Sequence, residues 1–160
     1  MSTQIRGTSW SVKVTPTISS SPAYSSGDQI GGIQTLTGAM INGGTGTLMS
    51  VVVLDKAAQK SALNIWFFKN QPTMASTDNA AFDITDANLV LAEPLGFVSI
   101  AAADYVDSSS NAVGQASLAD AIMVQSAASD GTIYAVVESA GTPTYGSTSD
   151  LVFTYFFAQD

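Results

Sequence analysis

Short apolar runs separated by turn-forming residues make up most of the chain. The clearest runs are "TLMSVVVLD" (47–55), "ALNIWFFK" (62–69) and "LVFTYFFA" (151–158), each about the length of a strand. Clusters of Gly, Ser, Asp and Pro separate the runs, as in "NGGTG" (42–46). This spacing is typical of an all-β sandwich or barrel. We therefore expect an antiparallel β-sandwich of about eight strands with little helix.

Weaker segments complete the expected set of strands. They lie at residues 9–14, 33–41, 96–102, 112–127 and 132–139. Long, irregular connections favour a jelly-roll-like or related Greek-key sandwich over an up-and-down barrel with tight hairpins. An immunoglobulin-like sandwich is the main alternative, because strand order cannot be read from one sequence. Two short helices are expected, one beginning near Thr85 and one at 117–123 with Ser117 as its N-cap.

The N-terminal part of the chain differs from the rest. "TPTISSSPAYSSGDQIGG" (15–32) is too rich in Ser, Pro and Gly to form the interior of an element. We expect residues 1–24 to form an N-terminal strand followed by an extended arm or loop. Residues 25–160 should then form a single β-sandwich domain, because a chain of this length buries about 70% of its unfolded surface without disulfides.

Two of the expected strands are apolar on both faces. In the segment 62–69, alternate residues from Leu63 share one face, while Trp66 and Phe68 point to the other. The strand at 151–158 has the same double pattern. A strand that is apolar on both sides is usually buried on both sides. We expect a second sheet plus a helix, or a partner subunit, to cover each of them.

The composition argues against several classes of function. The chain has no cysteine and no histidine, which removes thiolate nucleophiles, the commonest general base and the usual transition-metal ligands. Thirteen acidic and five basic residues give a net charge of −8, so the chain is repelled by phosphate backbones. We expect no nucleic-acid partner, no cofactor and no enzymatic activity.

The hydrophobic content points to protein neighbours rather than to a membrane. The longest apolar stretch, "LVLAEPLGFVSIAAA", is interrupted by Glu93, Pro94 and Gly96, and the N-terminus has no apolar signal segment. Charged residues make up only 11% of the chain and hydrophobic residues 46%. This balance suggests that other protein subunits cover much of the surface.

Three aspartates lie within nine positions in "STDNAAFDITDAN" (76–88). An EF-hand loop would need ligands at alternate positions, a turn glycine and a closing glutamate, and here two alanines follow Asp78 instead. A pair of catalytic carboxylates is a second reading, but Phe82 is the only aromatic residue in the stretch that could support a sugar.

A third reading assigns these aspartates to the shape of a connection, and we favour it. Asp78 would accept backbone hydrogen bonds in a turn. Thr85 would cap a short helix, with Asp86 in its first turn near the positive end of the helix dipole. The residues expected to hold this segment on the sandwich are Phe82, Ile84, Leu89 and Leu91.

The stretch 63–100 resembles a family of small virion proteins of tailed bacteriophages. The resemblance is carried by "IWFFKNQPT", "TDNAAF" and "TDAN", and upstream by "AYSSGDQIGG" and "GTGTLMSVVVLD". It covers about residues 20 to 102, with a vaguer match at the final strand. It implies a jelly-roll-like capsid decoration (cement) protein on the outer surface of the virion. Such a protein binds the major capsid protein and itself, with a homotrimer as the expected state.

The residues proposed for capsid or subunit contact are Ile5, Arg6, Trp10, Trp66 and Phe68. Arg and Trp are common interface residues, and an N-terminal arm can wrap around a partner. The alternative places the N-terminus as a frayed end and the aromatic residues in the core. Lys56, Lys60 and Lys69 are either contacts to an acidic capsid surface or plain solvated charges.

Two other functions compete with the capsid role. A carbohydrate- or receptor-binding β-sandwich, such as a head fibre or tail-associated adhesin, would carry a groove with exposed aromatic residues. The candidates for that groove are Trp66, Tyr105, Tyr134 and Tyr145. A glycoside hydrolase would need two acids facing each other in a cleft, and no feature of the sequence points to it.

Overall fold

The computed structural model describes residues 8–40, 44–116, 122–127 and 130–159. These residues form ten strands in two antiparallel sheets, one α-helix and one short 3-10 turn. The prediction of an all-β antiparallel sandwich with little helix is confirmed, with ten strands rather than about eight. The jelly-roll description of its strand order stays a prediction.

The larger sheet has the strand order β1-β10-β3-β7-β6, and β8 pairs with the first half of β3. Its strands are β1 (Thr8–Val14), β10 (Leu151–Gln159), β3 (Gly44–Asp55), β7 (Asn111–Gln115), β6 (Tyr105–Ser108) and β8 (Ile122–Ser126). The smaller sheet has the order β2-β9-β4-β5. Its strands are β2 (Gln29–Leu36), β9 (Ile133–Ser139), β4 (Leu63–Phe68) and β5 (Pro94–Ile100). The 3-10 turn is η1 (Ala102–Asp104).

The main core lies between the two sheets. From β4 it receives the predicted face that begins at Leu63, and from β10 the face that includes Phe153, Tyr155 and Phe157, all of them buried. The rings of Phe67 and Tyr155 meet edge to face across the core, with centroids 5.8 Å apart. Successive side chains of a strand point to opposite faces of the sheet, so alternate residues of both strands point into the core.

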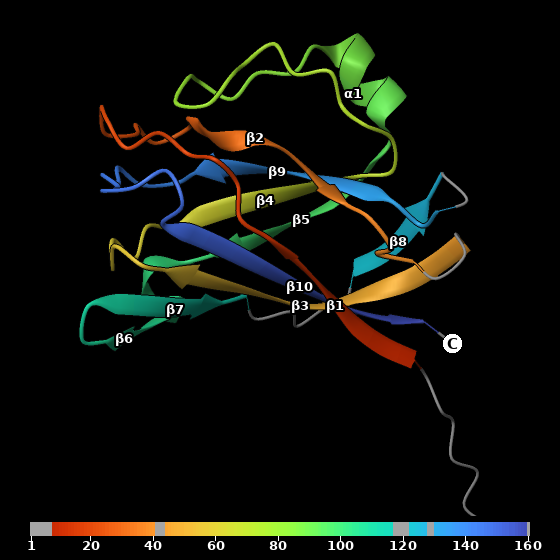
Figure 1. Ribbon diagram of the computed structural model, residues 1–160. Coiled ribbons are helices and arrows are strands. Elements are labelled where there is room, and N and C mark those ends of the chain that lie inside the picture. Colours follow the sequence, from red (N-terminus) through yellow and green to blue (C-terminus); the bar gives the residue numbers. More distant parts are fainter. Residues whose placement is uncertain (1–7, 41–43, 117–121, 128–129, 160) are drawn as a thin grey trace, which may run out of the picture.

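A long connection covers the outer face of the smaller sheet. We call residues 69–93, which join β4 to β5 and contain α1 (Asp86–Ala92), the cover segment. In Figure 1 it forms a layer above the smaller sheet, and no described segment lies on the outer side of the larger sheet. Between the cover segment and the smaller sheet, Ala92 of α1 forms a second buried cluster with Phe68 of β4 and Val136 of β9. For β4, the expectation of burial on both faces is met at Phe68, whereas Asn64 and Trp66 on the same face are half-buried.

The structure corrects two details of the helix predictions. Leu91 is 72% exposed rather than in the core. In an α-helix, residues two positions apart point in nearly opposite directions, so the inward position of Leu89 turns Leu91 outward. Most of the second predicted helix (117–123) lies outside the described residues, but Ile122 and Met123 belong to β8 and pair with β3.

Part of the predicted N-terminal arm belongs to the sandwich. β1 pairs along its full length with β10, and Ile18 and Tyr24 are buried in the main core. The described part of the chain contains no helix that is long and apolar enough to cross a membrane.

Candidate interaction surfaces

The clustered aspartates hold the cover segment in place. The Asp78 Oδ1 accepts hydrogen bonds from the Tyr24 hydroxyl at 2.6 Å and from the Gly31 backbone N–H at 2.5 Å. The Thr85 side chain accepts a bond from the Asn88 N–H at 3.3 Å, and Asp86 lies in the first turn of α1. These contacts agree with the prediction that the aspartates shape a connection. Within the described ranges, no cluster of three or more His, Cys, Asp or Glu residues could hold a metal ion.

Tyr24 links the N-terminal segment to the cover segment. Its hydroxyl accepts a bond from the Ser19 N–H at 2.7 Å while donating to Asp78. Asn79 strengthens the same link, because its side-chain amide donates to the Pro22 carbonyl at 3.0 Å. Burial, and then the hydrogen bond to Asp78, raise the pKa of Tyr24 above its ordinary value.

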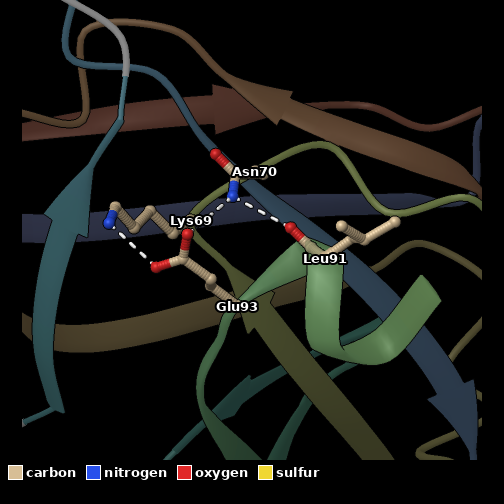
Figure 2. Close-up of polar contacts among 4 residues, drawn as sticks. All are labelled: Lys69, Asn70, Leu91 and Glu93. Atoms are coloured by element: carbon tan, nitrogen blue, oxygen red, sulfur yellow. Dashed lines mark hydrogen bonds and ion pairs between the residues drawn. The ribbon is translucent and has the colours of Figure 1, made fainter. Parts of the chain in front are cut away.

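A polar clamp closes the two ends of the cover segment. Figure 2 shows Lys69 paired with Glu93 at 2.8 Å, while the Asn70 amide donates to the Leu91 carbonyl at 3.0 Å and to Glu93 at 3.1 Å. The hydrogen bonds from Lys69 and Asn70 lower the pKa of Glu93. The helix α1 ends at Glu93, whose backbone has a left-handed conformation (φ 51°). The side-chain contacts of the clamp then hold this end of the helix beside the end of β4.

The outer face of the larger sheet carries exposed apolar side chains among uncharged polar ones. One row of side chains crosses four strands through the register pairs Val106–Val113, Val113–Leu54 and Leu54–Val152. Val106 is 74% exposed. Near the other end of the face, the exposed large side chains are Met49 (51%), Met123 (67%) and Phe156 (39%). We expected β10 to be buried on both faces, but no described segment covers its outer face, and Phe156 on that face is exposed.

Two hollows lie on either side of Met49. The first, of about 460 Å³, is lined by Met49, Met123 and the Gly44–Thr47 segment among others. The second, of about 280 Å³, lies between Met49, Phe156 and β1. The register of β3 against β10 shifts between Phe156 and Phe157, and the shift leaves Met49 unpaired on that side, as in a β-bulge. The bulge directs Met49 outward between the two hollows.

Charge is distributed unevenly over the molecule. None of the described acidic residues lies on an outward position of the larger sheet. Asp55 on β3 is buried, and Asp107 on the edge strand β6 forms an ion pair with Lys60 at 2.9 Å. Lys13 is the one charged side chain among those outward positions in the described strands. The opposite side is acidic, because the cover segment contributes Asp78, Asp83, Asp86 and Glu93, and β9 contributes Glu138.

A smaller mixed surface lies on the smaller sheet beside the cover segment. We call Asn64, Trp66, Phe97, Ser99 and Glu138 the Phe97 shelf. The Trp66 ring stacks between Phe82, with centroids 5.6 Å apart, and Phe97 at 5.5 Å. Its indole N–H donates to the Glu138 carboxylate at 3.1 Å. Phe97 is 59% exposed.

The proposed contact residues fall in different environments. Ile5 and Arg6 lie outside the described residues. Trp10 is half-buried; its indole N–H donates to the Gly38 carbonyl at 2.9 Å, and its ring lines the second hollow. Trp66 is half-buried under its neighbours. Phe68 is fully buried beneath the cover segment, so its ring presents no surface to a capsid or to a neighbouring subunit.

Most of the tyrosines proposed for a sugar-binding groove do not reach the surface. Tyr105 and Tyr145 are buried, and Tyr134 packs against the second cluster. All three lysines proposed for the capsid have partners within the chain. Lys60 and Lys69 form ion pairs, and the Lys56 ammonium donates to the Ser149 carbonyl at 2.8 Å.

The exposed residues of the larger sheet were not predicted from the sequence. The signal for Phe156 was present, because the second face of 151–158 was recognised as apolar, but a covering element was assumed. Met49 gave no such signal, since its outward direction depends on a bulge set by a strand about a hundred residues away.

Comparisons with protein-family models and with curated proteins found no match to this chain.

Proposed function

We propose that this protein is a bacteriophage capsid decoration protein that binds the outside of the major capsid lattice and stabilises the head. The observation that carries the proposal is the nearly uncharged outer face of the larger sheet, on which exposed Val, Met and Phe side chains lie among uncharged polar ones. Exposed large apolar side chains that gather on one uncharged face of a folded domain often mark a site where another protein binds. Met and aromatic residues are enriched in the centres of such sites, and charged residues are depleted.

The charge distribution supports one orientation on a lattice. The acidic cover segment would face solvent, and the uncharged face would meet the capsid. In that orientation the net charge of −8 keeps particles apart without opposing the docking contact. Met49 and its two hollows offer flexible side chains and shallow space, which suit the insertion of apolar residues from a capsid subunit.

The resemblance supports the same role through a second part of the chain. The residues that carry it, 63–100, span β4, the cover segment and β5. The stacked rings, the Asp78 bonds and the clamp at Glu93 make this region a stiff brace on the smaller sheet. A protein that reinforces a shell under pressure needs such stiffness more than it needs a catalytic site. Self-association as a homotrimer remains part of the proposal.

Co-sedimentation with capsids stripped of the protein tests the proposal. We expect saturable binding at fixed lattice positions, with the larger sheet facing the lattice in an image reconstruction, and higher resistance of the filled heads to heat. Absence of binding to the head lattice under conditions where the purified protein is folded would refute it. Sedimentation equilibrium of the purified protein would test the trimer independently.

A further inference from the structure

The Phe97 shelf combines an exposed ring with a row of polar groups. Trp66 pairs with Phe97 in the register of β4 and β5, so both rings lie on the same face of the smaller sheet. Phe82 and Trp66 stack at an interplanar angle of 22°, and Trp66 and Phe97 lie at 35°. Phe97 is the outermost ring of the three, and the stack beneath it holds its orientation.

The polar row lies one step along the same face. Register pairs Asn64 with Ser99 on β5 and with Glu138 on β9, so the three side chains form a line across three strands. The Ser99 hydroxyl donates to the Asn64 Oδ1 at 2.7 Å, and the Asn64 amide donates weakly to Glu138 at 3.5 Å. Same-face residues two positions apart on a strand lie about 7 Å apart, so Phe97 and Ser99 are neighbours.

The hydrogen bonds within the row leave acceptor capacity for a ligand. Both bonds donated to Glu138 end on its Oε2, from Trp66 at 3.1 Å and from Asn64 at 3.5 Å. A carboxylate has a second oxygen with its own acceptor sites, and a serine hydroxyl accepts bonds while donating one. The row therefore offers a carboxylate oxygen, an amide and a hydroxyl, all held in place by neighbouring strands.

We propose that the Phe97 shelf binds a neutral carbohydrate. A hexose ring presents an apolar C–H face, which packs on an aromatic ring, and hydroxyl groups at its edge, which pair with carboxylate, amide and hydroxyl side chains. Glu138 and the overall negative charge oppose acidic sugars, so the site selects neutral ones. A single exposed ring on an open surface gives weak binding, with a Kd of about 1 mM for one site.

This site is separate from the capsid-binding face. The shelf lies on the outer side of the smaller sheet, and the proposed capsid contact lies on the outer side of the larger sheet. Both surfaces can therefore be occupied at once. A decoration protein present in many copies would convert weak sugar binding into strong attachment of the particle to a glycan-coated surface.

NMR titration of the purified protein tests the site directly. The probes are neutral tetrasaccharides of glucose, galactose, mannose and N-acetylglucosamine, with a sialylated tetrasaccharide as the acidic comparison. We expect saturable shifts of the Trp66 indole N–H signal, and of the backbone amides of Phe97 and Ser99, with at least one neutral probe. The sialylated probe should cause smaller shifts at the same concentration.

Three variants assign the effect to the shelf. Phe97→Ala should weaken binding at least tenfold, while Phe97→Trp, which keeps a ring, should retain it. Val106→Ala, at an exposed position on the larger sheet, should bind like the unchanged protein. The amide spectrum of each variant shows whether it is folded. The proposal is overturned by absence of saturable shifts up to about 10 mM of every neutral probe, by unchanged binding in Phe97→Ala, or by preference for the acidic sugar.

Discussion

Tyr155 donates a hydrogen bond of 2.7 Å to the side-chain carbonyl of Gln34, and this bond joins the two sheets inside the main core. Tyr155 lies on β10 of the larger sheet and Gln34 on β2 of the smaller one, and both are buried. The Gln34 side-chain nitrogen is buried without a partner among the described residues. A buried polar pair with one unsatisfied donor makes the stability of the sandwich sensitive to changes at either residue.

Tyr155→Phe should lower the free energy of unfolding by about 1–3 kcal/mol, because it leaves the Gln34 carbonyl without its donor in the core. Urea unfolding followed by circular dichroism measures the change. Tyr155→Phe combined with Gln34→Leu is the matched control. Removing both polar partners, together with the unpaired nitrogen, should recover most of the loss. If the double variant is less stable than the single one, the bond is not the source of the effect.

Alkaline pH should destabilise the protein through its buried tyrosines. Burial raises the pKa of Tyr105, Tyr145 and Tyr155 above the ordinary value, and burial with the Asp78 bond does so for Tyr24. A raised pKa means that the folded state holds its proton while the unfolded state releases it. The stabilisation is therefore complete below pH of about 10 and falls as the pH rises further.

Urea midpoints measured across this range test the sign. Above pH of about 10, Tyr155 alone should contribute a loss of about 1.4 kcal/mol per pH unit. Tyr155→Phe should remove that share of the slope while the other tyrosines keep theirs. A midpoint that stays constant through the onset of tyrosine ionisation in the unfolded chain would contradict the prediction.

Gly131→Ala should be severely destabilising. A Cβ built on Gly131 lies 1.6 Å from the carbonyl oxygen of the buried Met40, and the residue has a φ of +75°. Relief would require backbone movement, because the clashing atoms belong to the main chain. We expect a loss of about 4 kcal/mol or more in thermal or urea unfolding.

Gly27→Ala provides the control for backbone strain alone. Gly27 also has a positive φ, of +93°, but an added Cβ meets nothing within 4 Å. Its substitution should cost about 1–2 kcal/mol from the left-handed conformation. Similar losses for the two variants would show that the close contact at Met40 is not decisive.

Local sequence patterns predicted correctly those elements whose structure depends on neighbouring residues. The strand at 151–158 follows from its alternation, and the Thr85 cap from a side chain that reaches a backbone N–H three residues on. β6 was missed because only Tyr105 among its four residues is buried. Gln34 is accommodated in the core because Tyr155, 121 positions away, donates a hydrogen bond to its side-chain carbonyl, and no local pattern contains that information.

The candidate surfaces were only partly accessible from sequence. Trp66 was proposed from the sequence as a contact residue, but its neighbours Phe97 and Glu138 were not, because only strand pairing brings the three together. A tyrosine looks the same in sequence whether it is buried or exposed. Tyr105 and Tyr145 were therefore proposed for a groove, although the structure places them inside.

Phe82→Ala should loosen the cover segment without unfolding the sandwich. Phe82 is half-buried and stacks on Trp66, so its removal should cost about 2 kcal/mol, less than a fully buried Phe. We expect faster hydrogen exchange and faster proteolysis within residues 69–93, while the strands of the larger sheet keep their protection. Leu91→Ala, at an exposed position of the same segment, should leave both rates unchanged. Uniformly faster exchange throughout the chain would mean that the cover segment does not open separately.

Met49→Asp should abolish binding to stripped capsids while preserving the fold. The substitution places a charge between the two hollows, on a face whose described outward positions carry no acid. An unpaired charge at a desolvated interface is strongly unfavourable. Met49 is 51% exposed, so the monomer should lose little stability.

Leu91→Asp makes the same kind of change at a 72% exposed position on the acidic side, and it should still bind. Co-sedimentation of both variants with stripped heads measures the difference. If both bind equally, the larger sheet does not face the lattice; if Leu91→Asp alone fails, the cover segment is the docking surface and the proposed orientation is reversed.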